Sequence, residues 1–200
     1  MSSAFWLGWR CVLGLSAVSK TPQNMRRTGE CVLNLASIDN VAAVNRLART
    51  TGSDPVPPAK TLRGYRFEPD KFGISGLTPV ASETVAPARV LECPVQLEAT
   101  VESIHQLGER DPDLRPGALI IEVRIQRVHV DEAILMPGTA NRIDPDRWRP
   151  LIMSFQQFYG LSARTLQEST LAQIPEALYR SPDVDRARRA APAGAGAARG

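Results

Sequence analysis

The chain has 200 residues, of which 43% are hydrophobic, and its formal net charge is +3. This length suits one domain with its own hydrophobic core, and no apolar run approaches the roughly 20 residues of a transmembrane helix, which argues against a membrane protein. Residues 181–200 hold four arginines against two aspartates and so carry +2 of the net charge; the rest of the chain is close to neutral, which argues against nucleic-acid binding.

The N-terminal part predicts a strand followed by a helix. Residues Trp9–Ala17 lean apolar and predict a short strand. After it, Thr21 and Pro22 are predicted to be the N-cap and the first residue of a helix, and Gly29 to end that helix.

The turn between this strand and helix holds candidate phosphate ligands: Ser16, Ser19, Lys20 and Thr21. Their hydroxyls, an ammonium group and free backbone N–H groups would converge at a helix start, where the helix dipole adds positive partial charge. The same residues also fit a plain helix cap, and from the local pattern alone both interpretations stay open.

The middle of the chain predicts a strand over Cys31–Leu35 and a helix over Ile38–Arg49. Residues 53–89 are rich in Pro and predict a long loop with a short helix near Glu68–Phe72. Because structureless loops of this length are unusual, the segment is expected to cover a site or a partner surface.

Two strands follow with a clear period of two. Apolar residues alternate with polar ones over Val95–Glu102, which predicts a strand with one face in water, and again over Leu119–Gln126. The apolar phase slips by one residue at Arg127, which predicts a β-bulge or bend of the kind that lets strands curl into a barrel. A further short strand is predicted near Ala133–Leu135.

The C-terminal part is predicted as an extension of the domain. A helix is expected from Ser162 to Tyr179, interrupted at Pro175, and the Ala/Gly/Pro/Arg segment 181–200 is expected to be disordered. The predicted organisation is therefore a domain over 1–160, a helical extension over 161–180 and a tail over 181–200.

Cysteines and histidines suggest neither a metal site nor a catalytic constellation. Cys11, Cys31 and Cys93 form no CxxC pair, and their odd number on apparent strands indicates reduced thiols in a cytoplasmic protein. His105 and His129 lie on different segments without a third ligand-type residue, so no metal is expected and the catalytic residues stay unknown.

An ordered series of segments resembles the flavin reductase-like family, whose fold is the FMN-binding split barrel. The segments that carry the resemblance are Ser2–Gly8, Arg10–Ser16, Ser19–Asn24, Thr28–Leu35, Gly76–Pro79, Pro87–Glu98, Val128–Asp131 and Ile143–Asp146. They span most of residues 1–160.

The resemblance implies an α+β fold, an FMN-binding split β-barrel with flanking short helices. It implies noncovalent FMN at a homodimer interface, with Ser2, Ser3 and Ala4 along the flavin ring. It also implies that Ser16, Ser19, Lys20 and Thr21 hold the phosphate, with Asn24 as an addition. Family members have an earlier strand and hairpin partner before the segment that matches Met1–Ser3, so this chain is expected to be N-terminally truncated, to have a misassigned start, or to do without that strand.

The implied function is FMN-dependent hydride and electron transfer between NAD(P)H and an unknown acceptor, in which the cofactor supplies most of the chemistry. Two alternatives remain: an FMN-binding electron carrier without its own NAD(P)H activity, and a truncated, inactive family member. A partner oxygenase is not specified by the sequence. Trp6 and Trp9 would either flank the flavin or pack in a core or interface. Arg10 would either neutralise reduced flavin or lie on the surface, and Cys11 is expected to be a packed thiol.

Overall fold

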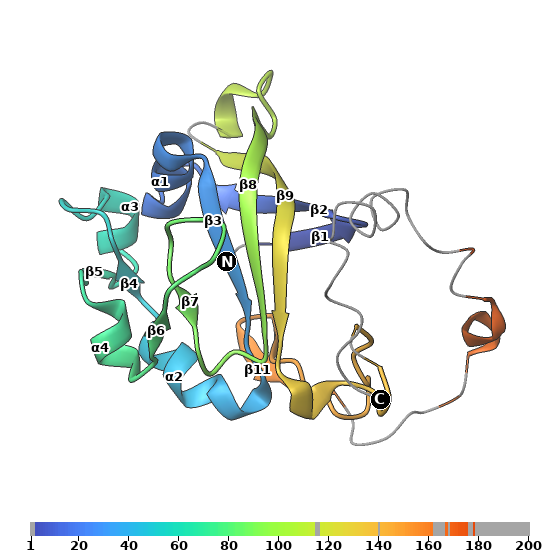
Figure 1. Cartoon of the computed structure of the whole chain (residues 1–200). Coiled ribbons are helices and arrows are strands. Elements are labelled where there is room, and N and C mark those ends of the chain that lie inside the picture. The colour runs from blue at the N-terminus through green and yellow to red at the C-terminus, as the bar shows by residue number, and fades with distance from the viewer. Residues whose placement is uncertain are drawn as a thin grey trace.

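The computed structural model describes residues 3–114, 117–139, 141–161, 167, 169–175 and 178. Its centre is an antiparallel sheet of five strands in the order β1-β2-β9-β8-β3. The strands are β1 (Ser3–Leu7), β2 (Arg10–Ser16), β3 (Glu30–Leu35), β8 (Val95–Gln106) and β9 (Ala118–Val130). Figure 1 shows the β1–β2 hairpin crossing behind the long strands β8 and β9, so the sheet is strongly twisted.

The hydrophobic core lies on one face of this sheet. Alternate residues of β2, β8 and β9 point into it, as the period of two predicts, and Met25 of the first helix covers them. The buried strand residues are Cys11, Leu13, Val95, Leu97, Ala99, Leu119, Ile121, Val123 and Ile125. The predicted strands Trp9–Ala17, Cys31–Leu35, Val95–Glu102 and Leu119–Gln126 are confirmed.

The predicted bulge is present, but the sheet does not close. Glu98 pairs with Arg127 while Ala99 pairs with Ile125, so one extra residue of β9 is accommodated where the apolar phase slips. β1 and β3 form the two edges of an open sheet, and no described strand pairs with the outer edge of β1. The described strands therefore form an open sheet rather than a closed barrel, and the expected α+β class is confirmed.

Short helices flank the β3 edge of the sheet (Figure 1). They are α1 (Lys20–Thr28), the 3-10 turn η1 (Ile38–Asn40), α2 (Val41–Arg46), α3 (Pro58–Thr61) and α4 (Lys71–Ser75). The helix predicted over Ile38–Arg49 is shorter, because α2 ends at Arg46, and Arg49 beyond it takes a left-handed conformation with φ 55°. The helix predicted near Glu68–Phe72 begins at Lys71 instead, with Asp70 accepting a hydrogen bond from the Gly73 N–H.

Residues 53–89 are an ordered excursion rather than a structureless loop. They hold α3, α4 and two short strands: β5 (Arg66–Phe67), which pairs with β4 (Thr50–Thr51) just before the segment, and β6 (Pro79–Val80), which pairs with β7 (Arg89–Val90) at its end. Arg46 donates hydrogen bonds from its guanidinium to the Ser75 carbonyl, which fixes α4 against α2.

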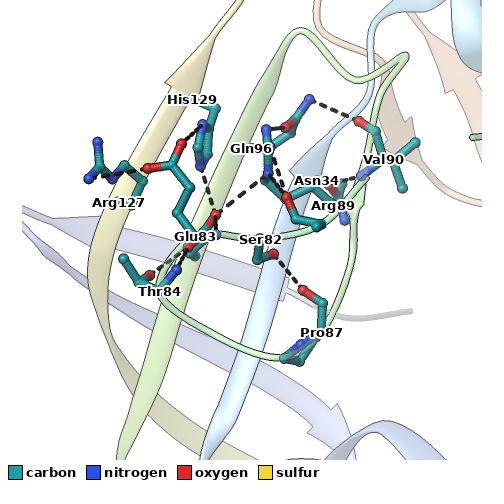
Figure 2. Close-up of polar contacts among 12 residues, drawn as sticks. Asn34, Ser82, Glu83, Thr84, Pro87, Arg89, Val90, Gln96, Arg127 and His129 are labelled. Carbon is teal, nitrogen blue, oxygen red and sulfur yellow. Dashed lines mark hydrogen bonds and ion pairs between the residues drawn. The ribbon is translucent and has the colours of Figure 1, made fainter. Parts of the chain in front are cut away.

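The outer face of β8 is exposed as predicted at Glu102 but not in the first half of the strand, which the second half of the excursion covers. Gln96 and Glu98 are 7% and 0% exposed. Glu98 accepts hydrogen bonds from the Glu83 and Thr84 N–H groups and from the Thr84 hydroxyl, at 2.9, 2.6 and 2.5 Å. His129 Nε2 lies 2.7 Å from the same carboxylate (Figure 2). Alternation alone could not show that a distant loop supplies partners for these groups.

The segment after β9 forms short elements. The strand predicted near Ala133–Leu135 is instead the 3-10 turn η3 (Glu132–Ile134), followed by a single bridge between Leu135 and Ile143. A hairpin of β10 (Ile152–Ser154) and β11 (Gln157–Tyr159) follows, and the 3-10 turn η4 is described over Thr170–Gln173. Half of the residues in the helix predicted over Ser162–Tyr179 and all of the tail 181–200 lie outside the described residues. None of the described helices is long and apolar enough to cross a membrane.

Candidate functional site: a lysine-lined anion pocket

The turn from β2 to α1 leaves the start of the helix open to a ligand. β2 ends at Ser16, and Ser19, rather than Thr21, is the N-cap of α1. No side chain caps the helix, and no acidic residue occupies its first turn. The Ser19 hydroxyl instead accepts a hydrogen bond from Lys60 Nζ at 3.3 Å. The predicted alternative of a plain cap at Thr21 is therefore wrong, and the free N–H groups carry the positive end of the helix dipole.

The excursion supplies the opposite wall of a cavity of about 330 Å³ at this turn. We call it the anion pocket. Its walls come from the end of β2, the start of α1, β4 and the excursion. The lining residues are Leu15, Ser16, Ser19, Lys20, Thr21, Thr50, Thr51, Gly52, Lys60, Arg63, Tyr65 and Lys71. Four of them are cationic and none is a carboxylate.

Lys60 is the most buried of these cations. It is 9% exposed, and its Nζ donates to the Ser19 and Thr51 hydroxyls at 3.3 and 3.2 Å. The ammonium also lies 5.8 Å from the centre of the Tyr65 ring. Burial, together with the nearby Arg63 charge, lowers the pKa of Lys60. A buried cation without a carboxylate partner is costly, and an anion bound in the pocket would offset that cost.

Lys71 supports the same pocket from α4. Its Nζ donates to the Thr50 hydroxyl at 2.7 Å, and that hydroxyl donates in turn to the Leu47 carbonyl at 2.7 Å. Burial lowers the pKa of Lys71; Glu68 opposes this effect, and Lys60 and Arg66 add to it. A hydroxyl that accepts from an ammonium keeps its own hydrogen, so the Ser19 and Thr51 hydroxyls retain a hydrogen for donation to an anion.

The structure brings together four of the predicted site residues and separates the others. Ser16, Ser19, Lys20 and Thr21 all line the anion pocket. Asn24 lies a turn further along α1, exposed and outside the lining, where its carbonyl accepts from the Thr28 hydroxyl.

The predicted ring-contacting residues lie at the start of β1. The Ser3 backbone pairs with Gly14 and Ala4 pairs with Leu13, so this strand runs beside the part of β2 that leads to the pocket. Ser2 lies outside the described residues.

Sequence reasoning missed most of the pocket. Thr50, Thr51, Lys60, Arg63, Tyr65 and Lys71 were not among the predicted ligands. The available signal was the long Pro-rich segment, which was expected to cover a site. The segment contains two of the chain's three lysines, Lys60 and Lys71.

Other tempting residues have structural partners. Trp9 packs against the core, whereas Trp6 is 41% exposed and lines a separate apolar hollow with Trp148 and Phe158. Arg10 pairs with Glu102 and Glu122 at 3.0 and 3.2 Å on an exposed face. No cluster of three potential metal ligands occurs among the residues that the structure describes.

The Glu98 cluster has the buried charge expected of a functional group, but its contacts are structural. Burial alone would raise the pKa of Glu98; hydrogen bonds from Thr84, the Glu83 backbone and His129 outweigh it and lower the pKa to about 2. Arg89 adds an ion pair at 3.5 Å and also donates to Gln96 (Figure 2). The cluster fastens the loop around Thr84 to the sheet, and its carboxylate has no free side for a substrate.

The fold is an α+β domain with a cation-lined pocket, and comparison with known proteins identifies its family. The profile of the flavin reductase-like domain matches residues 8–162. The chain is 36% identical over 161 residues to the Bacillus subtilis protein YdfE, itself uncharacterized, covering 80% of this chain and 74% of that protein. The chain belongs to the flavin reductase-like family.

Solved structures support the fold. Component B of nitrilotriacetate monooxygenase from Bacillus cereus is similar with a TM-score of 0.62 and 20% identity, over 83% of this chain and 76% of that one. Flavoredoxin from Desulfovibrio vulgaris gives the same TM-score and identity over 82% and 76%. A putative flavin reductase with a split-barrel domain from Shewanella frigidimarina gives 0.60 and 16% over 84% and 76%. At these identities the likeness concerns the fold alone.

Proposed function

We propose that the chain binds FMN noncovalently, with the phosphate in the anion pocket and the flavin ring along the start of β1. The observation that carries this proposal is the burial of Lys60 in a pocket whose described lining has four cations and no carboxylate. A phosphate monoester brings nearly two negative charges and oxygen acceptors for the surrounding donors. The residues of the pocket therefore fit the group that the family implies.

The chain's own residues would bind and orient the cofactor. Lys60 and Lys71 would neutralise the phosphate from the excursion, while Ser19 and the first N–H groups of α1 would donate from the opposite wall. Ser2, Ser3 and Ala4 would contact the ring. FMN, when bound, supplies the hydride-accepting chemistry at its N5 position, so a separate nucleophile or acid–base pair is not needed.

We further propose that the protein is an NAD(P)H-dependent oxidoreductase that acts as a cytoplasmic homodimer. The edge strand β1 exposes Phe5 and Leu7 at 65% and 75%, which favours a covered partner surface there. Burial raises the pKa of Cys31 and Cys93 to about 11, which suits unreactive thiols in a reducing compartment. No nucleic-acid or membrane partner is proposed.

The test is FMN binding followed by turnover. Equilibrium dialysis of the purified chain should show FMN bound at micromolar concentration, and light scattering should give the mass of a dimer. Failure to bind FMN would refute the proposal. Steady-state oxidation of NADH and NADPH by the FMN-loaded protein then separates the enzyme from an electron carrier, because a carrier would bind FMN without sustaining turnover.

A further inference from the structure

All three lysines of the chain line one pocket. The sequence has 24 Lys and Arg residues, but its only lysines are Lys20, Lys60 and Lys71, and each of them lines the anion pocket. Every other cationic side chain is an arginine. Lysine differs from arginine in one chemical respect that matters here: a lysine can lose its proton and become a nucleophile, whereas an arginine stays charged. The pocket therefore concentrates every side-chain amine of the protein at one anion site.

Lys60 is the amine best placed to react. Its Nζ is held between Ser19 and Thr51 at 3.3 and 3.2 Å, so its position in the cavity is fixed. Burial and the Arg63 charge lower its pKa, which increases the fraction of neutral amine near neutral pH. Burial lowers the pKa of Lys71 as well, although the Glu68 carboxylate opposes this effect, and the Lys71 ammonium donates to the Thr50 hydroxyl at 2.7 Å. Lys20 is exposed at the rim of the pocket.

The remaining groups would hold a phosphate leaving group beside this amine. Lys20, Arg63 and Lys71 surround the same cavity, and Arg63 is oriented by a hydrogen bond from its Nε to the Ala59 carbonyl at 2.9 Å. A phosphorylated acyl donor bound through its phosphate would therefore bring its carbonyl carbon close to Lys60. The cations would also stabilise the charge that develops on the departing phosphate.

We propose that Lys60 is an acylation site for acyl phosphates. The deprotonated Nζ attacks the acyl carbon, the bond between that carbon and the bridging oxygen breaks, and phosphate leaves with the bonding electron pair. The net reaction converts Lys60 ammonium and acyl phosphate to the Lys60 amide, hydrogen phosphate and one proton released to solvent. No oxidant or reductant is required.

Acylation of Lys60 would reduce the affinity of the anion pocket for phosphate. It removes the Lys60 charge and fills part of the cavity with an acyl group, so a later phosphate would lose its most buried counter-charge. This regulatory consequence depends on the proposed binding of FMN; the acylation itself depends only on the anion pocket.

The experiment compares two acyl donors on the flavin-free chain, with peptide mass spectrometry as the readout. Acetyl phosphate should acetylate Lys60 faster than Lys20 or the N-terminal amine, with a rate that saturates and is suppressed by inorganic phosphate. N-acetoxysuccinimide has no phosphate and should label by exposure, with Lys20 ahead of Lys60 and no protection by phosphate. A non-saturating rate with acetyl phosphate, faster labelling of Lys20, or no protection by phosphate would overturn the proposal.

Two further arms locate the site and its consequence. Lys60→Arg keeps the charge and should abolish the phosphate-sensitive acetylation; persistence of the same acetylation at Lys71 or Lys20 would show that Lys60 is not the acceptor. In the wild-type chain, acetylation of Lys60 should weaken FMN binding at least about tenfold. If inorganic phosphate protects Lys60 and unmodified chain still binds no FMN, the proposed function fails while the acylation site stands.

Discussion

Replacement of Lys60 by Met separates a binding role from a structural one, because the two roles predict opposite effects. The substitution removes a cation that is 9% exposed. The described contacts of its ammonium are hydrogen bonds to the Ser19 and Thr51 hydroxyls and a contact with the Tyr65 ring. Met keeps a similar length and apolar stem, so the site should stay filled. Since no carboxylate of the lining loses a partner, folding stability should be unchanged or slightly raised.

FMN affinity should move in the other direction. Two unit charges about 4 Å apart interact by about 4 kcal/mol at an effective dielectric constant of about 20, before the desolvation of Lys60 is subtracted. We expect a net loss of about 2–3 kcal/mol, which is roughly 30- to 150-fold in Kd. Riboflavin affinity, which involves no phosphate, should not change.

The assay is titration calorimetry with FMN and riboflavin, beside thermal denaturation without ligand. Arg26→Met is the matched control, because Arg26 is exposed in the last turn of α1, outside the anion pocket, and the substitution removes the same charge. Equal loss of FMN affinity in both variants would show a long-range charge effect. An unchanged FMN affinity in Lys60→Met would refute the assignment of the pocket.

Four further predictions concern pH dependence and the fold. FMN affinity should fall as pH rises towards 10.5, earlier than an ordinary lysine would give, because the pKa values of Lys60 and Lys71 are lowered; a midpoint at or above 10.5 would contradict this. Glu98→Gln should cost about 2–4 kcal/mol in urea denaturation at pH 7. Because the folded pKa of Glu98 is about 2 against an ordinary 4.5, its stabilisation should persist above pH 4.5 and disappear as pH falls towards 2. The unfolding free energies of wild type and variant should therefore converge in acid. A difference that stays constant with pH would be evidence against the cluster. Gly29→Ala should lower the free energy of unfolding by about 1–2 kcal/mol through its φ of 71° alone. In Gly160→Ala the added methyl group would meet the Ile38 side chain at 2.7 Å and lower it by about 1–3 kcal/mol. Thermal melts equal to wild type in either variant would contradict these local geometries.

The sequence was a good guide where local rules decide the structure. The period of two located β8 and β9, and the phase slip at Arg127 located the bulge, because one buried face fixes the register of a strand. Gly29 ended α1 as predicted, because glycine readily adopts the left-handed φ that a helix C-terminus needs and this preference depends on the residue itself. The turn at Ser16–Thr21 was identified for the same reason, although the N-cap proved to be Ser19.

Long-range contacts account for what was missed. Whether Glu98 faces water depends on the loop that carries Thr84, which lies 14 residues before it. The alternation of polar and apolar residues within the strand holds no information about that loop. Lys60 reaches Ser19 from a position 41 residues away, so no local motif could place the two together. The strand predicted at Ala133–Leu135 became a 3-10 turn because Asp131 caps it by accepting from the Ala133 N–H.

The affinity difference between FMN and riboflavin, measured by calorimetry at low and high salt, tests the central claim most directly. The two ligands share the ring and differ only in the phosphate, and four cationic side chains line the anion pocket. We predict that FMN binds at least about 100-fold more tightly at low salt and that the ratio narrows as salt screens the charges. Equal affinities, or a ratio that does not respond to salt, would contradict the assignment of the phosphate to this pocket.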